Sequence, residues 1–113
     1  MMNLAETVSG ANKTVNITGI EIGRFRLKSG ITEEALRAAY ATMIASHLAL
    51  QTGWYAQHLV KLSDDVFLDI AFATSEDHAK AICASWQDQP VCNAFLALIE
   101  PVSMEFGTIV SSH

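Results

Sequence analysis

The stretch GWYAQHLVKLSDDVFLDIAF, residues 53–72, decides the fold of this chain. It contains two runs of strand-forming residues, 53–62 and 66–72, and the segment Ser63-Asp64-Asp65 between them is typical of a hairpin turn. Every residue of VFLDIAF except Asp69 is apolar, whereas a strand with one face in water alternates apolar and polar residues. We therefore predict two adjacent antiparallel strands, the second covered on both faces.

The segments before this pair predict a strand and a long helix. Residues 19–28, GIEIGRFRLK, alternate between two faces, which is the pattern of a strand. Thr32 is a helix-capping residue, and two glutamates follow it in the first turn, where the helix dipole favours acidic side chains. The predicted helix runs to about residue 50, and one stripe of it should pack on a flat surface: Leu36, Tyr40, Met43, His47 and Leu50.

The segments after the pair predict two helices and a last strand. Thr74-Ser75-Glu76-Asp77 resembles a capping box and begins a helix that ends near residue 88. Pro90 suits the first position of a short extra helix over 90–98, and residues 102–110 form the last strand. With right-handed crossovers, the order β-α-β-β-α-(α)-β predicts the α+β class. We expect a ferredoxin-like sandwich, with a four-stranded antiparallel sheet and helices on one face.

The helices of such a sandwich cover only one face of the sheet. Because the strands carry large apolar residues on both faces, the second face needs a cover of its own. The simplest cover is a second copy of the same sheet. We therefore expect a homodimer through the sheet face, which is a dimeric α+β barrel.

Length and composition limit the classes of protein. We expect one domain over residues 17–113 after a flexible N-terminal tail, residues 1–16. The net charge of −5 and the lack of a basic run argue against nucleic-acid binding. No apolar run reaches the roughly 18–20 residues of a membrane span, and the first residues lack a secretory signal, so we expect no membrane association and a cytoplasmic location. Cys83 and Cys92 match no zinc spacing, and we expect reduced thiols and no metal site.

Several segments together resemble the dimeric α+β barrel superfamily, and within it the antibiotic biosynthesis monooxygenase-like domains. The resemblance covers about residues 18–110. It rests on the order and spacing of these segments: IEIGRFRLKSG, LALQTGW, YAQHLVKL, DVFLDIAFATSEDHAKAI and QPVCNAFLALIEP.

This resemblance implies a small-molecule cavity between sheet and helices, and activities that vary across the superfamily. Some members resemble cofactor-free monooxygenases acting on phenolic polyketides, and others degrade haem, dechlorinate or isomerise small molecules. The monooxygenase pattern often has a tryptophan late in the third strand, where this chain has Phe72-Ala73-Thr74. We assign no cofactor.

Two histidines are the candidate catalytic bases. His47 lies on the apolar stripe of the first helix, and His58 lies on one face of the second strand; an imidazole suits proton transfer near neutral pH. Each is also compatible with a purely structural role. The candidate walls for a small aromatic or apolar ligand, which could equally be ordinary packing residues, are Tyr40, Trp54, Tyr55, Trp86 and Phe95.

Asp69 interrupts an apolar strand, and a buried lone carboxylate is costly. We expect it to pair with Arg24 or Arg26 of the same or the other subunit, as an ion pair or as part of an anion site.

Three classes of function stay open on these residues. The first is a cofactor-free small-molecule oxygenase or isomerase. The second is a non-catalytic module that binds a small molecule in the same cavity. The third is a structural dimer whose core is filled.

Overall fold

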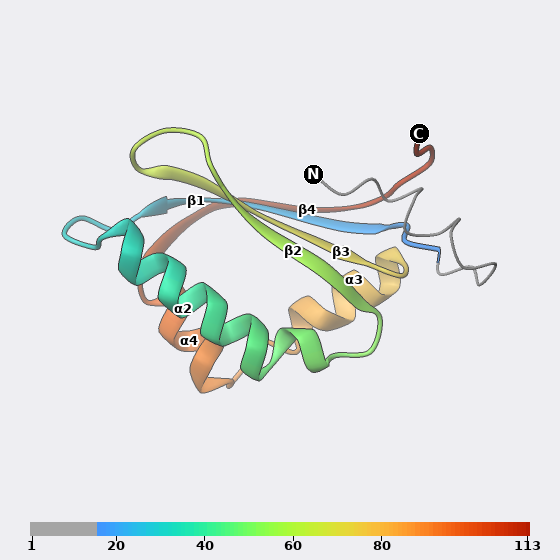
Figure 1. The fold of residues 1–113 in the computed structure, drawn as a ribbon, viewed down its shortest axis with the longest axis horizontal. Helices are drawn as coiled ribbons and strands as arrows, with labels where there is room; N and C mark the ends of the chain where they lie inside the picture. Colours follow the sequence, from blue (N-terminus) through green and yellow to red (C-terminus); the bar gives the residue numbers. More distant parts are fainter. Residues whose placement is uncertain (1–15) are drawn as a thin grey trace.

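The computed structural model describes residues 16–113, which form a four-stranded antiparallel sheet with its helices on one face (Figure 1). The spatial order of the strands is β2-β3-β1-β4, so β2 and β4 are the edges. This arrangement confirms the predicted ferredoxin-like α+β fold. The predicted tail lies, apart from residue 16, outside the described residues. The elements in chain order are β1 (Gly19–Leu27), α2 (Glu33–Ser46), η1 (Leu48–Leu50), β2 (Trp54–Lys61), β3 (Val66–Ala73), α3 (Glu76–Ala84), α4 (Pro90–Leu96) and β4 (Ile99–Thr108).

Both longer helices begin at the predicted caps. The side chain of Thr32 accepts a hydrogen bond of 3.0 Å from the backbone N–H of Ala35. The side chain of Ser75 accepts one of 3.0 Å from the backbone N–H of His78. Each bond satisfies a backbone donor that the first helical turn leaves without a partner.

The first helix ends earlier than its apolar periodicity predicts. Helix α2 stops at Ser46, because His47 leaves the helical conformation (φ −141°, ψ −62°) and the chain continues as the short 3₁₀ helix η1. Leu50, which was expected on the packed stripe, is 74% exposed. The change of helix type rotates this residue away from the sheet.

The last strand begins earlier than predicted. Helix α3 ends at Ala84 and α4 at Leu96, and β4 already starts at Ile99, so Pro101 lies inside it. The register of β1 with β4 shifts at this point, between Arg24 and Phe25. A proline is tolerated here because β4 is an edge strand with an irregular register.

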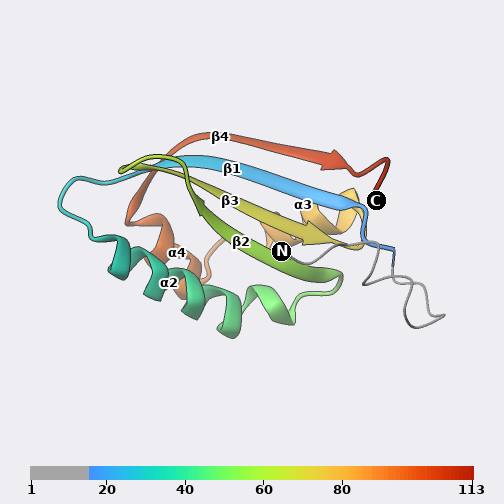
Figure 2. The same ribbon diagram turned by 45° about the horizontal axis from the view of Figure 1, so that its top comes forward.

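The core lies between the sheet and the helices and is built around Phe25. Its ring stacks on Phe67 with centroids 5.8 Å apart, and it meets Phe95 edge-on at 5.7 Å. Tyr40 of α2 contacts Phe95 of α4 at 5.5 Å between ring centroids, which joins the two helices on their side of the sheet. Figure 2 shows these helices beneath the sheet, on the same side as α3.

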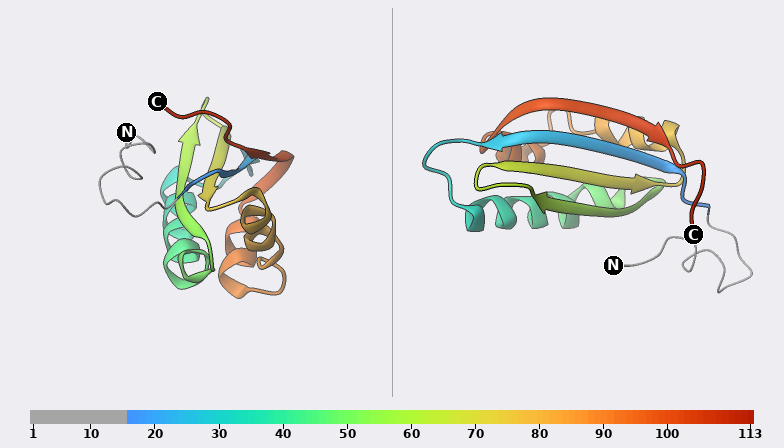
Figure 3. Two further views of the ribbon diagram at one scale, coloured as in Figure 1. Left: turned by 90° about the vertical axis from the view of Figure 1, so that its right-hand side faces the viewer. Right: turned by 90° about the horizontal axis from the view of Figure 1, so that it is seen from above.

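The opposite face of the sheet has no cover in the described part of the chain. In β3, residues 67, 69, 71 and 73 are buried toward the helices, whereas Leu68, Ile70 and Phe72 of the other face are only partly buried. Figure 3 shows this asymmetry, with all helices on one side of the strands. Within the chain, β3 is thus covered on one face rather than on both. No helix formed by residues 16–113 is long and apolar enough to cross a membrane.

Candidate functional site

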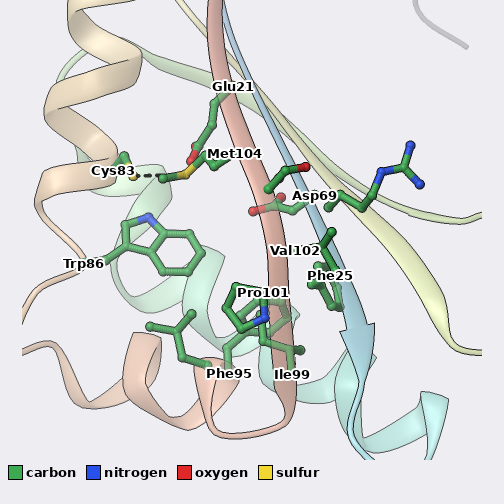
Figure 4. Close-up of a pocket in the computed structure, with 14 residues that line it drawn as sticks. Glu21, Phe25, Asp69, Cys83, Trp86, Phe95, Ile99, Pro101, Val102 and Met104 are labelled. Carbon is green, nitrogen blue, oxygen red and sulfur yellow. Dashed lines mark hydrogen bonds between the residues drawn. The ribbon is translucent and has the colours of Figure 1, made fainter.

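A cavity of about 410 Å³ opens between β1, β4 and the helices α3 and α4 (Figure 4). This volume lies in the range typical of small-molecule sites. The walls are mostly apolar, and the polar and charged residues among them come from β1, β3, α3 and β4. The lining residues are Glu21, Gly23, Arg24, Phe25, Asp69, Cys83, Trp86, Phe95, Leu96, Ile99, Pro101, Val102, Ser103 and Met104.

Asp69 is held by neutral donors and not by an arginine of its own chain. The hydroxyl of Tyr40 donates a 2.6 Å hydrogen bond to Oδ1 of Asp69. The amide of Gln57 donates to both carboxylate oxygens, at 3.0 and 3.2 Å. Trp54 extends this hydrogen-bond network, because its indole N–H donates a 3.0 Å bond to Oε1 of Gln57.

The predicted ion pair of Asp69 with Arg24 or Arg26 of the same chain is therefore wrong. Asp69 lies opposite Gly23 and points toward the helices, whereas Arg24 and Arg26 alternate to the other face of the sheet. Arg26 instead pairs with Asp65 of the β2–β3 turn, at 3.1 Å. The register of β1 with β3 therefore places Asp69 and the two arginines on opposite faces of the sheet, although their strands are adjacent.

Glu21 is the second carboxylate of the cavity. It is 5% exposed, and Asp69 is 6% exposed. Glu21 pairs with Ala71 across the strands and Asp69 pairs with Gly23, so the two acids occupy diagonal positions on the same face. Gly23 follows Glu21 on the same face of β1 and lies directly opposite Asp69 of β3. Because Gly23 has no side chain, space stays open beside both carboxylates.

Burial raises the pKa of Glu21 to about 7, and the nearby charge of Asp69 adds to the effect. Burial also raises the pKa of Asp69, while the hydrogen bonds from Tyr40 and Gln57 act in the opposite direction. Burial, the charge of Asp69 and its hydrogen bond hold the pKa of Tyr40 far above the usual range of a phenol. Tyr40 is thus a fixed hydrogen-bond donor to Asp69.

Cys83 faces Glu21 from α3. Burial, together with the charge of Glu21, raises the pKa of this thiol to about 12, so it stays protonated and is a poor nucleophile. Its one hydrogen has two acceptors in reach, the sulfur of Met104 at 3.6 Å and the carboxylate of Glu21. The carboxylate is the stronger acceptor when it is ionised.

Of the five predicted aromatic residues, two line the cavity and three do not. Trp86 and Phe95 line the cavity, and their rings meet edge-on at 6.1 Å. The indole N–H of Trp86 is buried and has no hydrogen-bond partner among residues 16–113. Tyr40 and Trp54 belong to the hydrogen-bond network behind Asp69, and neither they nor Tyr55 is among the lining residues.

Both candidate histidines lie away from the cavity. His47 joins the ends of two helices, since its Nε2 is 2.9 Å from Oγ and 3.1 Å from the carbonyl oxygen of Ser85. His58 is exposed on the uncovered face of the sheet, where it contacts the ring of Phe72 at 5.9 Å. The structure therefore does not bring the two imidazoles together. Within residues 16–113, no group of three or more His, Cys, Asp or Glu side chains is placed to hold a metal ion.

Glu21, Gln57 and Cys83 were not among the predicted site residues. A signal for Glu21 does exist in the sequence, because this acid shares a strand face with Gly23, Phe25 and Leu27 and interrupts an apolar row, as Asp69 does. Gln57 and Cys83 offer no comparable signal, since their roles depend on contacts between distant segments.

The fold and cavity define a ferredoxin-like α+β protein with a small-molecule-sized cavity between its sheet and helices. No protein-family model matches the chain, and no curated protein matches its sequence. Solved structures match it throughout the described domain, as the following three examples show.

The first is SnoaB, a cofactor-independent oxygenase from Streptomyces nogalater. It is 19% identical, with a TM-score of 0.59 over 86% of this chain and 95% of that one. The second is a provisionally assigned antibiotic biosynthesis monooxygenase from Chloroflexus aurantiacus, 18% identical, with a TM-score of 0.61 over 85% and 96%. The third is a dimeric ferredoxin-like protein from an uncultured marine organism, 10% identical, with a TM-score of 0.59 over 92% and 97%. At these identities the likeness shows the fold, and the resemblance seen in the sequence is confirmed at that level.

Proposed function

We propose that this chain is a small-molecule enzyme that performs acid–base chemistry on an apolar compound, as a cofactor-free oxygenase or isomerase. One observation carries the proposal: an apolar cavity of about 410 Å³ has two buried carboxylates, Glu21 and Asp69, in its wall. Buried acids with perturbed pKa values are typical of catalytic sites, because burial brings a carboxyl group into the pH range where it exchanges protons. The fold shared with a cofactor-independent oxygenase supports the same class of reaction.

The cavity gives the proposal a direct binding test. Trp86 lines it and Trp54 does not, so a ligand in the cavity should change the fluorescence of Trp86. The wild-type protein should respond to small neutral aromatic compounds, and the Trp86→Phe variant should lose the response while it retains Trp54. An unchanged response in that variant would show that the ligand binds elsewhere.

Turnover is tested on the ligand that the protein carries. Compounds co-purifying with the protein from its own source are identified by mass spectrometry and then incubated with it under air and without oxygen. An oxygenase adds oxygen only under air, and an isomerase yields a product of unchanged mass in both. Recovery of the compound unchanged from wild type and from the Asp69→Asn variant alike would favour a non-catalytic binding module.

We also propose that the chain forms a homodimer through the uncovered face of the sheet. Apolar side chains gather there on three adjacent strands, and a solved structure of the same fold is a dimer. The residues of this face include Ile20, Ile22, Val60, Leu68, Ile70 and Phe72. A cytoplasmic location is consistent with the free thiols of Cys83 and Cys92 and belongs to the proposal.

The dimer is tested by analytical ultracentrifugation. Ile22 lies on the uncovered face and is 37% exposed, so Ile22→Asp should convert a dimer to a monomer. Leu50→Asp is the matched control, because Leu50 is 74% exposed on η1, on the side of the helices. A wild-type monomer at micromolar concentration, or a dimer unaffected by Ile22→Asp, would contradict the proposed interface.

A further inference from the structure

Within the proposed function, on which this inference rests, the two carboxylates of the cavity have different environments. Asp69 receives hydrogen bonds from Tyr40 and Gln57, both of which stabilise its ionised form. Among the side chains of residues 16–113, Glu21 receives only the weak thiol donor of Cys83. The two acids are close enough for the charge of one to disfavour the charge of the other. Asp69 therefore holds the negative charge more firmly, and Glu21 is the member of the pair that exchanges a proton.

We propose that Glu21 is the proton-accepting residue of the cavity, and that its ligands are uncharged, mainly apolar molecules with one weakly acidic hydrogen. The carboxylate of Glu21 takes this hydrogen as a proton, and the electron pair of the broken bond stays on the ligand. The negative charge moves from Glu21 to the ligand, so the total charge of the site is unchanged. Return of the proton to another atom of the ligand completes an isomerisation without any further reactant.

The charges around the cavity predict selectivity against anions. Groups that face Glu21 from the packed elements are Asp69 of β3, Cys83 of α3 and, more distantly, Tyr40 of α2. Arg24 is the one basic residue among those that line the cavity, but its side chain alternates to the opposite face of the sheet. No basic side chain of the described residues pairs with either carboxylate. An anionic ligand would therefore meet like charge in a site of low polarity, where repulsion is poorly screened. A neutral ligand of the same shape avoids this cost.

The burial of Glu21 supports its role in proton transfer. Its pKa of about 7 means that near neutral pH both forms of the acid are populated. A base is most effective when its pKa lies near the working pH, because it is then both available and strong enough to accept the proton. The charge of Asp69 adds to the effect of burial on the pKa of Glu21, and Tyr40 and Gln57 hold that charge by hydrogen bonds. We class these three as positioning residues.

A matched pair of probes tests both parts of the inference. 2-Naphthol and 2-naphthoate share one ring system, but at neutral pH the first is uncharged and the second is an anion. We expect 2-naphthol to bind at least about tenfold more tightly than 2-naphthoate, which corresponds to about 1.4 kcal/mol. Equal or tighter binding of the naphthoate would overturn the predicted charge selectivity.

The fluorescence of 2-naphthol reports proton transfer directly. Excitation makes this compound a strong acid, and naphthol and naphtholate emit at different wavelengths. With the protein in excess, so that all probe is bound, we expect naphtholate emission that rises with pH around a midpoint of about 7. Glu21→Gln should bind 2-naphthol but shift its emission to the naphthol form. Glu105→Gln is the control, because it makes the same substitution on the opposite face of the sheet, at a residue that does not line the cavity.

Asp69→Asn provides a second, independent variant. Removing the charge beside Glu21 should move the midpoint of naphtholate emission to lower pH. If wild-type protein binds neither probe, the proposed function and this inference both fail. If 2-naphthol binds but its emission is the same in wild type and Glu21→Gln, only the role of Glu21 is overturned, and the proposed function stands.

Discussion

The hydroxyl oxygen of Tyr40 lies 2.6 Å from Oδ1 of Asp69, and this bond ties helix α2 to strand β3 beneath the cavity. The two residues are separated by 29 positions in the chain. Asp69 is buried, and its burial would cost several kcal/mol without partners. Tyr40 and Gln57 supply these partners as neutral donors, so the site keeps its negative charge.

We expect Tyr40→Phe to lower the free energy of unfolding by about 1–3 kcal/mol, because it leaves a buried carboxylate with one donor side chain fewer. The same substitution should raise the pKa of Asp69 further, since the lost bond favours the ionised form. Urea denaturation of wild type, Tyr40→Phe, Asp69→Asn and the double variant measures the coupling. Because the Asn amide oxygen still accepts a hydrogen bond, an equal cost of Tyr40→Phe in both backgrounds would show that the charge of Asp69 adds nothing to this bond.

The pH dependence of stability should reveal Glu21. Its pKa is about 7 in the folded protein and 4.5 in its ordinary state, so the folded chain holds this proton more tightly than the unfolded chain. The resulting stability is complete below about pH 4.5 and is lost as the pH rises through 7, and the loss is on the order of 3 kcal/mol.

The Glu21→Gln variant does not titrate at this position. Its stability relative to wild type should therefore increase between about pH 4.5 and 7, as measured by denaturation at each pH. The difference in stability between the two proteins is free of the contributions of the other titrating groups, because both proteins share them. Parallel stability curves for wild type and variant would mean that the pKa of Glu21 is not raised by folding.

Gly23→Ala should reduce ligand binding without unfolding the protein. A β-carbon at this position would lie 3.9 Å from the nearest atoms, those of Asp69, which is ordinary contact, and it would occupy space between the two carboxylates. We expect stability to change by about 1 kcal/mol or less, and 2-naphthol affinity to fall by roughly fivefold, or about 1 kcal/mol.

Gly107→Ala is the matched control for this substitution. It is also a strand glycine, but it pairs with Ile20 on the opposite face of the sheet. We expect 2-naphthol to bind this variant as it binds wild type. Equal affinities for wild type and Gly23→Ala, measured by calorimetry, would place the ligand away from the carboxylates.

His47→Ala should cost stability and spare the site. Its imidazole bonds to Ser85 and so connects the end of α2 with the end of α3, and losing this contact should cost about 1–2 kcal/mol. Naphtholate emission from bound 2-naphthol should be unchanged in His47→Ala and in His58→Ala. Loss of the emission in either variant would return that histidine to the list of candidate bases.

The sequence by itself determined the order of the elements and the class of fold. Apolar periodicity, the caps at Thr32 and Ser75, and the turn at residues 63–65 are local signals, because each depends on neighbours within a few positions. For the same reason the sequence located Asp69 as an acid in an apolar strand that requires a partner. It also placed Trp86 and Phe95 on faces that turn toward the interior.

Only the tertiary structure decided which side chains share the site. Strand register placed Glu21 and Asp69 on the helix face and sent Arg24 and Arg26 to the other, and a shift of one residue would have exchanged these faces. Because helix α2 ends before His47, this candidate base contacts Ser85 at the end of α3 and does not pack against the sheet. Partner choice for a buried charge depends on geometry between distant segments, and periodicity along the chain does not contain that information.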